Sequence, residues 1–85
     1  MVYRIEFAPS AARAFKKFDA PIQNRLTPKI DTLATDPRPH GAEKLAGREN
    51  RYRIRVGDYR IIYVIDEGGR VIVIAVIGHR REVYR

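Results

Sequence analysis

The spacing of hydrophobic residues changes from a strand-like to a helical period early in the chain. Residues 2–7 alternate and are rich in β-forming side chains, which predicts an opening strand. Helical spacing follows and predicts a short helix to about residue 18, begun by Pro9 or by Ser10, whose hydroxyl can cap free backbone N–H groups. The apolar positions of this helix are Ala11, Ala12, Ala14, Phe15 and Phe18.

A second amphipathic helix is predicted directly after the first. Asp19 is the expected N-cap, with Pro21 in the first turn, and the helix extends to about Thr35. Pro28 lies inside it and removes one backbone hydrogen bond, so we expect a kink or a break that restarts at Thr27. The short connection predicts an antiparallel helical hairpin. The buried stripe of the second helix is Ile22, Leu26, Ile30 and Leu33.

The second half of the chain has the pattern of a β-meander. Residues 36–41 are a Pro/Gly-rich loop, and residues 43–50 are polar with one apolar anchor at Leu45. In residues 52–56 apolar side chains face one way and arginines the other. Gly57-Asp58 is a two-residue hairpin turn, although Asn-Gly would favour that turn more.

Two more apolar segments complete the pattern. Residues 59–65 are followed by a turn at residues 66–69, and residues 71–77 are apolar on both faces, as in a central strand covered on both sides. Residues 79–85 form a polar tail with room for one helical turn. The predicted class is α+β: an N-terminal strand, an antiparallel helical hairpin and a three-stranded antiparallel meander, forming one twisted sheet with the helices on one face.

Length, composition and charge limit the number of domains, the location and the kind of partner that we expect. The 85 residues predict one domain, 1–85, without cysteine and without a signal peptide. The longest apolar run, residues 71–77, is far shorter than the ~20 residues that span a membrane, so we expect a cytoplasmic protein with no membrane partner. The formal net charge of +7 favours an anionic partner, and arginine, which suits bidentate phosphate contacts, dominates the second half.

The candidate chemistry is a cluster of cations with one imidazole and one phenol. Arg53 and Arg55 share a strand face, roughly 7 Å apart, and Arg60 lies on the next strand with a face that depends on register. His79 has an unperturbed pKa near neutrality, and nearby arginines would favour the Tyr84 phenolate. Such a set could cleave RNA without metal, and no cofactor or metal site is expected. Each residue also has a purely structural interpretation. Arg53 and Arg55 could be ordinary residues on the solvent face of a strand. His79 could be a surface histidine, and Tyr84 could simply pack its ring on the end of the sheet.

Three segments resemble the RelE family of toxins, within the RelE/ParE superfamily of toxin–antitoxin systems, and the resemblance covers essentially the whole chain. These segments are Lys44-Leu45-Ala46-Gly47, the stretch from Tyr52 to Tyr63 that contains Tyr-Arg-Ile-Arg-Val-Gly-Asp-Tyr-Arg, and the stretch from Gly78 to Tyr84. The family implies a ribosome-dependent endoribonuclease that cuts mRNA in the ribosomal A site by 2′-hydroxyl attack on the adjacent phosphate. By similarity, Arg53, Arg55, Arg60 and Arg80 would stabilise the reacting phosphate. Arg80 would also help the leaving group, and Tyr84 would orient or deprotonate the nucleophile.

One departure from the family affects the proton transfers. Some members have lysines where this chain has Arg53 and Arg55, and an arginine effectively cannot lose its proton. His79, beside Arg80, is therefore the better proton carrier. Flanking cations are assigned to RNA binding: Lys44, Arg48, Arg51 and Arg81.

The resemblance also implies partners. They are a cognate antitoxin that covers or distorts the basic site, the ribosome and its mRNA, and operator DNA through the antitoxin complex. Two alternatives stay open. The first is a ParE-like toxin that binds DNA gyrase without nuclease chemistry, and the second is an inactive toxin that serves only as an antitoxin-binding corepressor.

Overall fold

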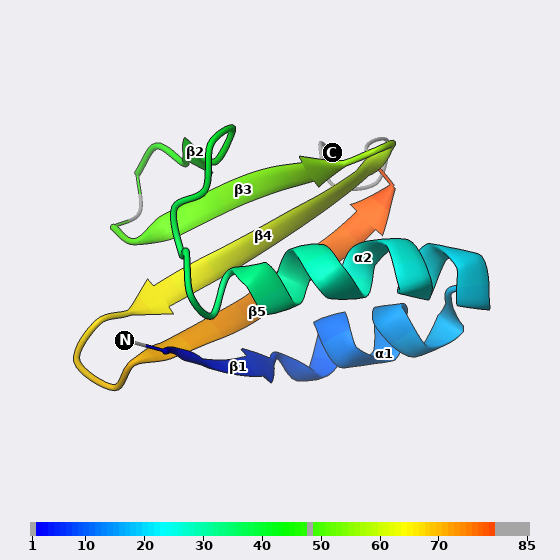
Figure 1. Ribbon diagram of the computed structural model, residues 1–85, viewed down its shortest axis with the longest axis horizontal. Helices are drawn as coiled ribbons and strands as arrows, with labels where there is room; N and C mark the ends of the chain where they lie inside the picture. Colours follow the sequence, from blue (N-terminus) through cyan, green and yellow to red (C-terminus); the bar gives the residue numbers. More distant parts are fainter. Residues whose placement is uncertain (1, 48, 80–85) are drawn as a thin grey trace.

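A five-stranded sheet with two helices on one face makes up the described part of the chain, residues 2–47 and 49–79 of the computed structural model. The strand order is β1-β5-β4-β3-β2, and β1 runs parallel to β5 while the other neighbours are antiparallel (Figure 1). The elements are β1 (Arg4–Phe7), α1 (Pro9–Lys17), α2 (Ala20–Thr32), β2 (Glu43–Lys44), β3 (Arg51–Val56), β4 (Tyr59–Asp66) and β5 (Val71–His79). The predicted α+β class, helical hairpin and antiparallel meander are confirmed.

The helix starts differ in one respect from the prediction. Ala8 is the N-cap of α1 and Pro9 occupies the first turn, so Ser10 lies inside the helix rather than capping it. Proline suits this position because its missing N–H would have no helical partner there. Asp19 is the N-cap of α2, as predicted, but its backbone carbonyl, not its carboxylate, accepts from Ile22 and Gln23 at 3.0 Å.

The second helix passes through Pro28 without a break and ends earlier than predicted. It is one element from Ala20 to Thr32, so the alternative of a restart at Thr27 is wrong. Beyond it the backbone tightens, since the N–H groups of Ala34 and Thr35 donate three residues back at 3.1 Å. Leu33 remains fully buried beyond the helix end, which is why the apolar stripe suggested a longer helix.

The sheet contains one strand that the sequence pattern did not reveal. β2 is only two residues long and pairs Glu43 with Arg53 and Lys44 with Tyr52 at the sheet edge. Such a short polar strand has no alternation to detect. The β3–β4 hairpin is as predicted, with a positive φ of 61° at Gly57 but not at Asp58, the pattern of a type II′ turn with glycine in its first central position.

The core lies between the helices and one face of the sheet. Leu26 and Ile30 of α2 pack with Ile61 and Ile74, all almost fully buried. The opposite face has no helical cover among the described elements (Figure 1), where Val71 of the interior strand β5 is buried and Val73 is half-buried. Among the described residues, helices therefore cover residues 71–77 on one face only. Neither described helix is long and apolar enough to cross a membrane.

Candidate nucleic-acid interface

Three predicted site residues lie together on the sheet face away from the helices. Arg53 and Arg55 alternate with the buried Ile54 and Val56, so their side chains leave β3 on the side opposite the core. The hairpin register places Arg60 directly opposite Arg55, which puts it on that same side. Arg53, Arg55 and Arg60 are called the arginine cluster below. The register that the sequence could not fix thus brings all three cations together.

The members of the arginine cluster differ in exposure. Arg55 is exposed, whereas Arg60 is only 6% exposed and is the one buried charged residue in the described chain. The Arg60 guanidinium donates two long hydrogen bonds to the carbonyl oxygens of Gly57 and Tyr59, at 3.4 and 3.3 Å. The hairpin turn therefore holds Arg60 in place, while Arg55 extends toward solvent.

A carboxylate that sequence analysis overlooked joins the arginine cluster. Glu43 pairs with Arg53 across β2 and β3, and the Arg53 guanidinium donates to its Oε1 at 2.6 Å. This hydrogen bond, followed by the charges of Arg53, Arg55 and Arg60, holds the pKa of Glu43 below its usual range. Glu43 was missed because the polar pattern of residues 43–50 does not predict a strand. The opposite charges of Glu43 and Arg53 would have been the signal for the pairing.

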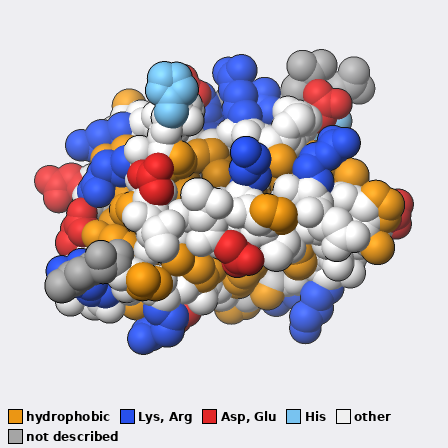
Figure 2. All heavy atoms as spheres, viewed as in Figure 1, with side chains coloured by type: hydrophobic (Ala, Val, Ile, Leu, Met, Phe, Trp, Pro, Cys, Tyr) orange, Lys and Arg blue, Asp and Glu red, His pale blue; other side chains and the backbone are white. Residues whose placement is uncertain are grey.

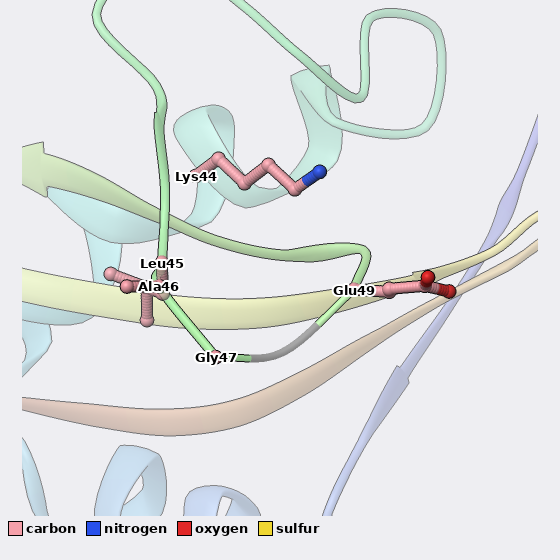
Figure 3. A pocket seen from close by; sticks show the side chains of 5 residues that line it. All are labelled: Lys44, Leu45, Ala46, Gly47 and Glu49. Atoms are coloured by element: carbon pink, nitrogen blue, oxygen red, sulfur yellow. The ribbon is translucent and has the colours of Figure 1, made fainter.

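The flanking cations assigned to RNA binding do not all face the same way. Arg51 lies on the same face of β3 as Arg53 and Arg55. Lys44 pairs with Tyr52, whose ring stacks on the buried Tyr63, so Lys44 leaves the edge strand on the helical side. It lines a separate hollow of about 400 Å³ in the β2–β3 loop, where Glu49 contributes a carboxylate (Figure 3).

His79 does not lie with the arginine cluster. It is the last residue of β5 rather than part of a tail, and it pairs with Tyr59, so it faces the helical side of the sheet. Its ring meets that of Tyr59 edge to face, with centroids 5.8 Å apart. The Tyr59 ring in turn contacts the ring of Phe18, the C-cap of α1, with centroids 5.3 Å apart. On β5 it is Gly78, not His79, that lies opposite Arg60. The expectation that the imidazole would join the arginines was wrong, because neighbouring residues on a strand point to opposite faces and His79 is next to the residue that lies opposite Arg60.

The remaining predicted site residues are Arg48, Arg80, Arg81 and Tyr84, and they lie outside the described residues. So does the predicted helical turn in the tail, apart from His79. Within residues 2–47 and 49–79, no group of three His, Cys, Asp or Glu side chains is arranged to hold a metal ion.

Charge on the helical side of the molecule is mixed. Figure 2 shows lysine and arginine side chains on this side scattered among acidic and apolar groups rather than gathered in one patch. The arginine cluster differs because three cations come from two adjacent strands within a few residues of one hairpin turn. Fixed guanidinium groups at this spacing suit the oxygens of a phosphate chain.

Comparison with known protein families gives a match over nearly the whole chain. The family described as "ParE toxin of type II toxin-antitoxin system, parDE" matches residues 5–84. Among curated proteins, "Putative toxin RelE1" of Methanocaldococcus jannaschii is 27% identical over 88 residues, which cover 100% of this chain and 98% of that protein.

Solved structures give the same picture of the fold. The archaeal RelE–RelB complex from Pyrococcus horikoshii contains a chain that is 29% identical, with a TM-score of 0.81 and coverage of 94% of this chain and 97% of that one. The isolated E. coli RelE toxin is 26% identical, with a TM-score of 0.83 and coverage of 96% and 90%. The two-helix, mixed-sheet architecture is therefore shared with these proteins at full length.

Proposed function

The chain belongs to the RelE/ParE family of toxins from type II toxin–antitoxin systems, and from this premise we propose that it is a ribosome-dependent endoribonuclease. It would cut mRNA in the ribosomal A site without a metal ion and so inhibit translation. The observation that carries the proposal is the arginine cluster, in which Arg53, Arg55 and Arg60 share one face of the β3–β4 hairpin. Family membership alone would not choose between cleavage and binding.

The proposed reaction is an internal transesterification of RNA. The 2′-oxygen attacks the adjacent phosphorus while the bond from phosphorus to the 5′-oxygen breaks, which leaves a 2′,3′-cyclic phosphate and a free 5′-hydroxyl. One proton leaves the 2′-hydroxyl and one reaches the departing 5′-oxygen. Negative charge grows on the phosphoryl oxygens in the transition state, and prearranged cations stabilise that charge most effectively.

The arginine cluster fits the electrostatic part of this reaction. Arg55 is exposed and can reach a phosphate in solution, whereas Arg60 is fixed by the turn carbonyls and needs little reorganisation. Arginine cannot serve as the base. By resemblance, Tyr84 is proposed to accept the 2′-hydroxyl proton, and Arg80 to stabilise the phosphate and the leaving group. The position of His79 beside Tyr59 argues against a direct proton transfer by its imidazole.

We also propose a cognate antitoxin as the protein partner. The similar Pyrococcus horikoshii toxin was solved in a complex with RelB. An acidic segment of such a partner would meet the arginine cluster and compete with RNA for it. The pair would bind operator DNA through the antitoxin.

The deciding experiment is induction of the chain in bacteria that lack the antitoxin, followed by primer extension on a translated mRNA. Cuts within codons that vanish when the start codon is removed are expected. The paired Arg53→Gln, Arg55→Gln variant should lose the cuts. Arg13→Gln with Lys17→Gln, which removes two exposed charges from α1, should keep them. Growth arrest with intact mRNA would overturn the proposal.

The alternative of a ParE-like toxin without nuclease chemistry has specific support. The matching family is described by its ParE member, and the His79 imidazole faces away from the arginine cluster. A ParE-like toxin that binds DNA gyrase would use the cluster as a docking surface without chemistry. In the same induction experiment it would arrest growth, leave mRNA intact and damage DNA.

A further inference from the structure

An internal anion already touches the arginine cluster. The Arg53 side chain is 17% exposed and donates to the Glu43 carboxylate at 2.6 Å, while the Glu43 side chain is 52% exposed. Glu43 belongs to the two-residue edge strand β2, and its backbone pairs with that of Arg53. The carboxylate is thus fixed by its strand on the face that carries all three cations.

The charges around Glu43 make it a stand-in for a phosphate oxygen. Arg53, Arg55 and Arg60 all lower the pKa of the Glu43 carboxyl, so the group is ionised at neutral pH. Conversely, the fixed negative charge of Glu43 weakens the attraction of these cations for any other anion. The Glu43 side of this ion pair is about half exposed and is therefore screened by water, so a phosphate can compete with it for Arg53.

We propose that Glu43 is an internal competitor of the RNA phosphate. It holds the Arg53 guanidinium in position while the site is empty, and it gives up this contact when a phosphate arrives. Glu43 is then a positioning residue that limits affinity, which allows substrate to leave and keeps free polyanions from occupying the site. This inference rests on the proposed function, because it assumes that the arginine cluster receives a phosphate backbone.

The test measures binding of a short fluorescent oligodeoxyuridylate, which lacks the 2′-hydroxyl and is not cut by this chemistry. Fluorescence anisotropy at low salt gives its affinity for the parent chain and for Glu43→Gln, which keeps the side-chain size and removes the charge. The competitor is expected to cost roughly three- to tenfold in affinity, so Glu43→Gln should bind more tightly by that factor.

The chain offers a matched control on the same sheet face. Glu6 pairs with Arg4 at 2.9 Å on β1, at the other edge of the five-stranded sheet. Glu6 lies opposite Val73 of β5, whereas Arg60 lies opposite Gly78, so five residues at about 3.3 Å each separate them along the strands, which exceeds the Debye length of about 10 Å. Glu6→Gln should change the affinity less than twofold. Equal gains from the two variants would show a general charge effect and overturn the inference.

A double-mutant cycle separates competition from a merely structural role. In an Arg53→Gln chain the Glu43→Gln gain should shrink, because the contact being exchanged is already gone and only the charges of Arg55 and Arg60 remain near Glu43. The inference would be overturned by a gain of undiminished size. It would also be overturned by a weaker affinity of Glu43→Gln or by absence of binding by the parent chain. Urea denaturation of each variant confirms that it is folded.

Primer extension tests cleavage separately. Tighter binding by Glu43→Gln without mRNA cuts would refute the proposed nuclease function, while the role of Glu43 as a competitor for an anion would stand.

Discussion

Arg55 and Arg60 lie directly opposite each other across β3 and β4, so two permanent positive charges share one cross-strand pair. Like charges in this position destabilise a sheet, and burial of Arg60 adds a desolvation cost. Nothing in the packing of the hairpin requires a cation at position 55, which is exposed. An arrangement that weakens the fold at one place is typical of a functional site.

The first prediction separates the stability of the hairpin from its activity. Arg55→Gln should raise the free energy of unfolding by about 0.5 kcal/mol, because it removes the repulsion from Arg60. The same change should slow mRNA cleavage on programmed ribosomes by at least about tenfold, because a fixed cation near the phosphate is lost. Urea denaturation and a cleavage time course measure the two effects on the same preparation.

Arg13→Gln provides the comparison, since it removes an exposed arginine from α1. It should change neither quantity appreciably. If Arg55→Gln lowers stability as well as activity, the pair stabilises the hairpin and the cost assigned to it here is wrong.

The second prediction concerns the ring of His79. His79→Phe should retain cleavage within a few-fold, because it preserves the edge-to-face contact with Tyr59. His79→Ala should lower the free energy of unfolding by about 1 kcal/mol, since such aromatic contacts contribute about 0.5–1.5 kcal/mol. Loss of cleavage in a stable His79→Phe chain would instead restore the imidazole as a proton carrier.

Much of the fold could be predicted because it follows from local patterns. The alternation around Ile54 and the stripe of Leu26 and Ile30 each identify an element and its buried face. Pairing information is different, because it depends on residues distant in sequence. The parallel contact of β1 with β5, which sets Phe7 beside Ile74, has no local signal.

The candidate site shows the same division. Arg53 and Arg55 could be placed on one face from strand alternation alone, but Arg60 needed the hairpin register. Glu43 was not recognised because a two-residue strand has no period, which left its charge, opposite to that of Arg53, as the signal for the pairing. His79 was misplaced for a different reason: its neighbour Gly78 holds the position that faces Arg60, and one residue along a strand reverses the direction of a side chain.

The third prediction uses the buried Tyr63 hydroxyl, which donates to the Pro37 carbonyl at 2.6 Å and ties the loop after α2 to the sheet. Tyr63→Phe should lower the free energy of unfolding at neutral pH by about 1 kcal/mol. Burial raises the pKa of Tyr63 to about 12. Between pH 10 and 12 the unfolded chain therefore loses a proton that the folded chain keeps, and the stability of the parent chain falls as pH rises. Tyr63→Phe should escape this loss. If the stability of the parent chain and that of Tyr63→Phe fall in parallel between pH 10 and 12, the raised pKa of Tyr63 is contradicted.

The fourth prediction concerns acid stability at the other end of the sheet. The Tyr3 hydroxyl donates to Glu67, and Arg38 donates to the same carboxylate at 2.8 Å. The hydrogen bond from Tyr3, followed by that from Arg38, lowers the pKa of Glu67. A lowered carboxyl pKa gives stability that is present above the unfolded-state value and lost as pH falls through the folded-state value.

Glu67→Gln should therefore flatten the fall of the urea midpoint below about pH 4.5, where the carboxylate of the unfolded chain begins to take up its proton. The effect should be small, because the Glu67 side chain is 49% exposed and water screens its ion pair. Tyr3→Phe keeps the ring and the Arg38 contact but removes the larger cause of the pKa shift, so its curve should lie between those of the parent and Glu67→Gln. A Tyr3→Phe curve as steep as that of the parent would mean that the hydroxyl contributes nothing to the acid response, and that Arg38 alone keeps Glu67 ionised.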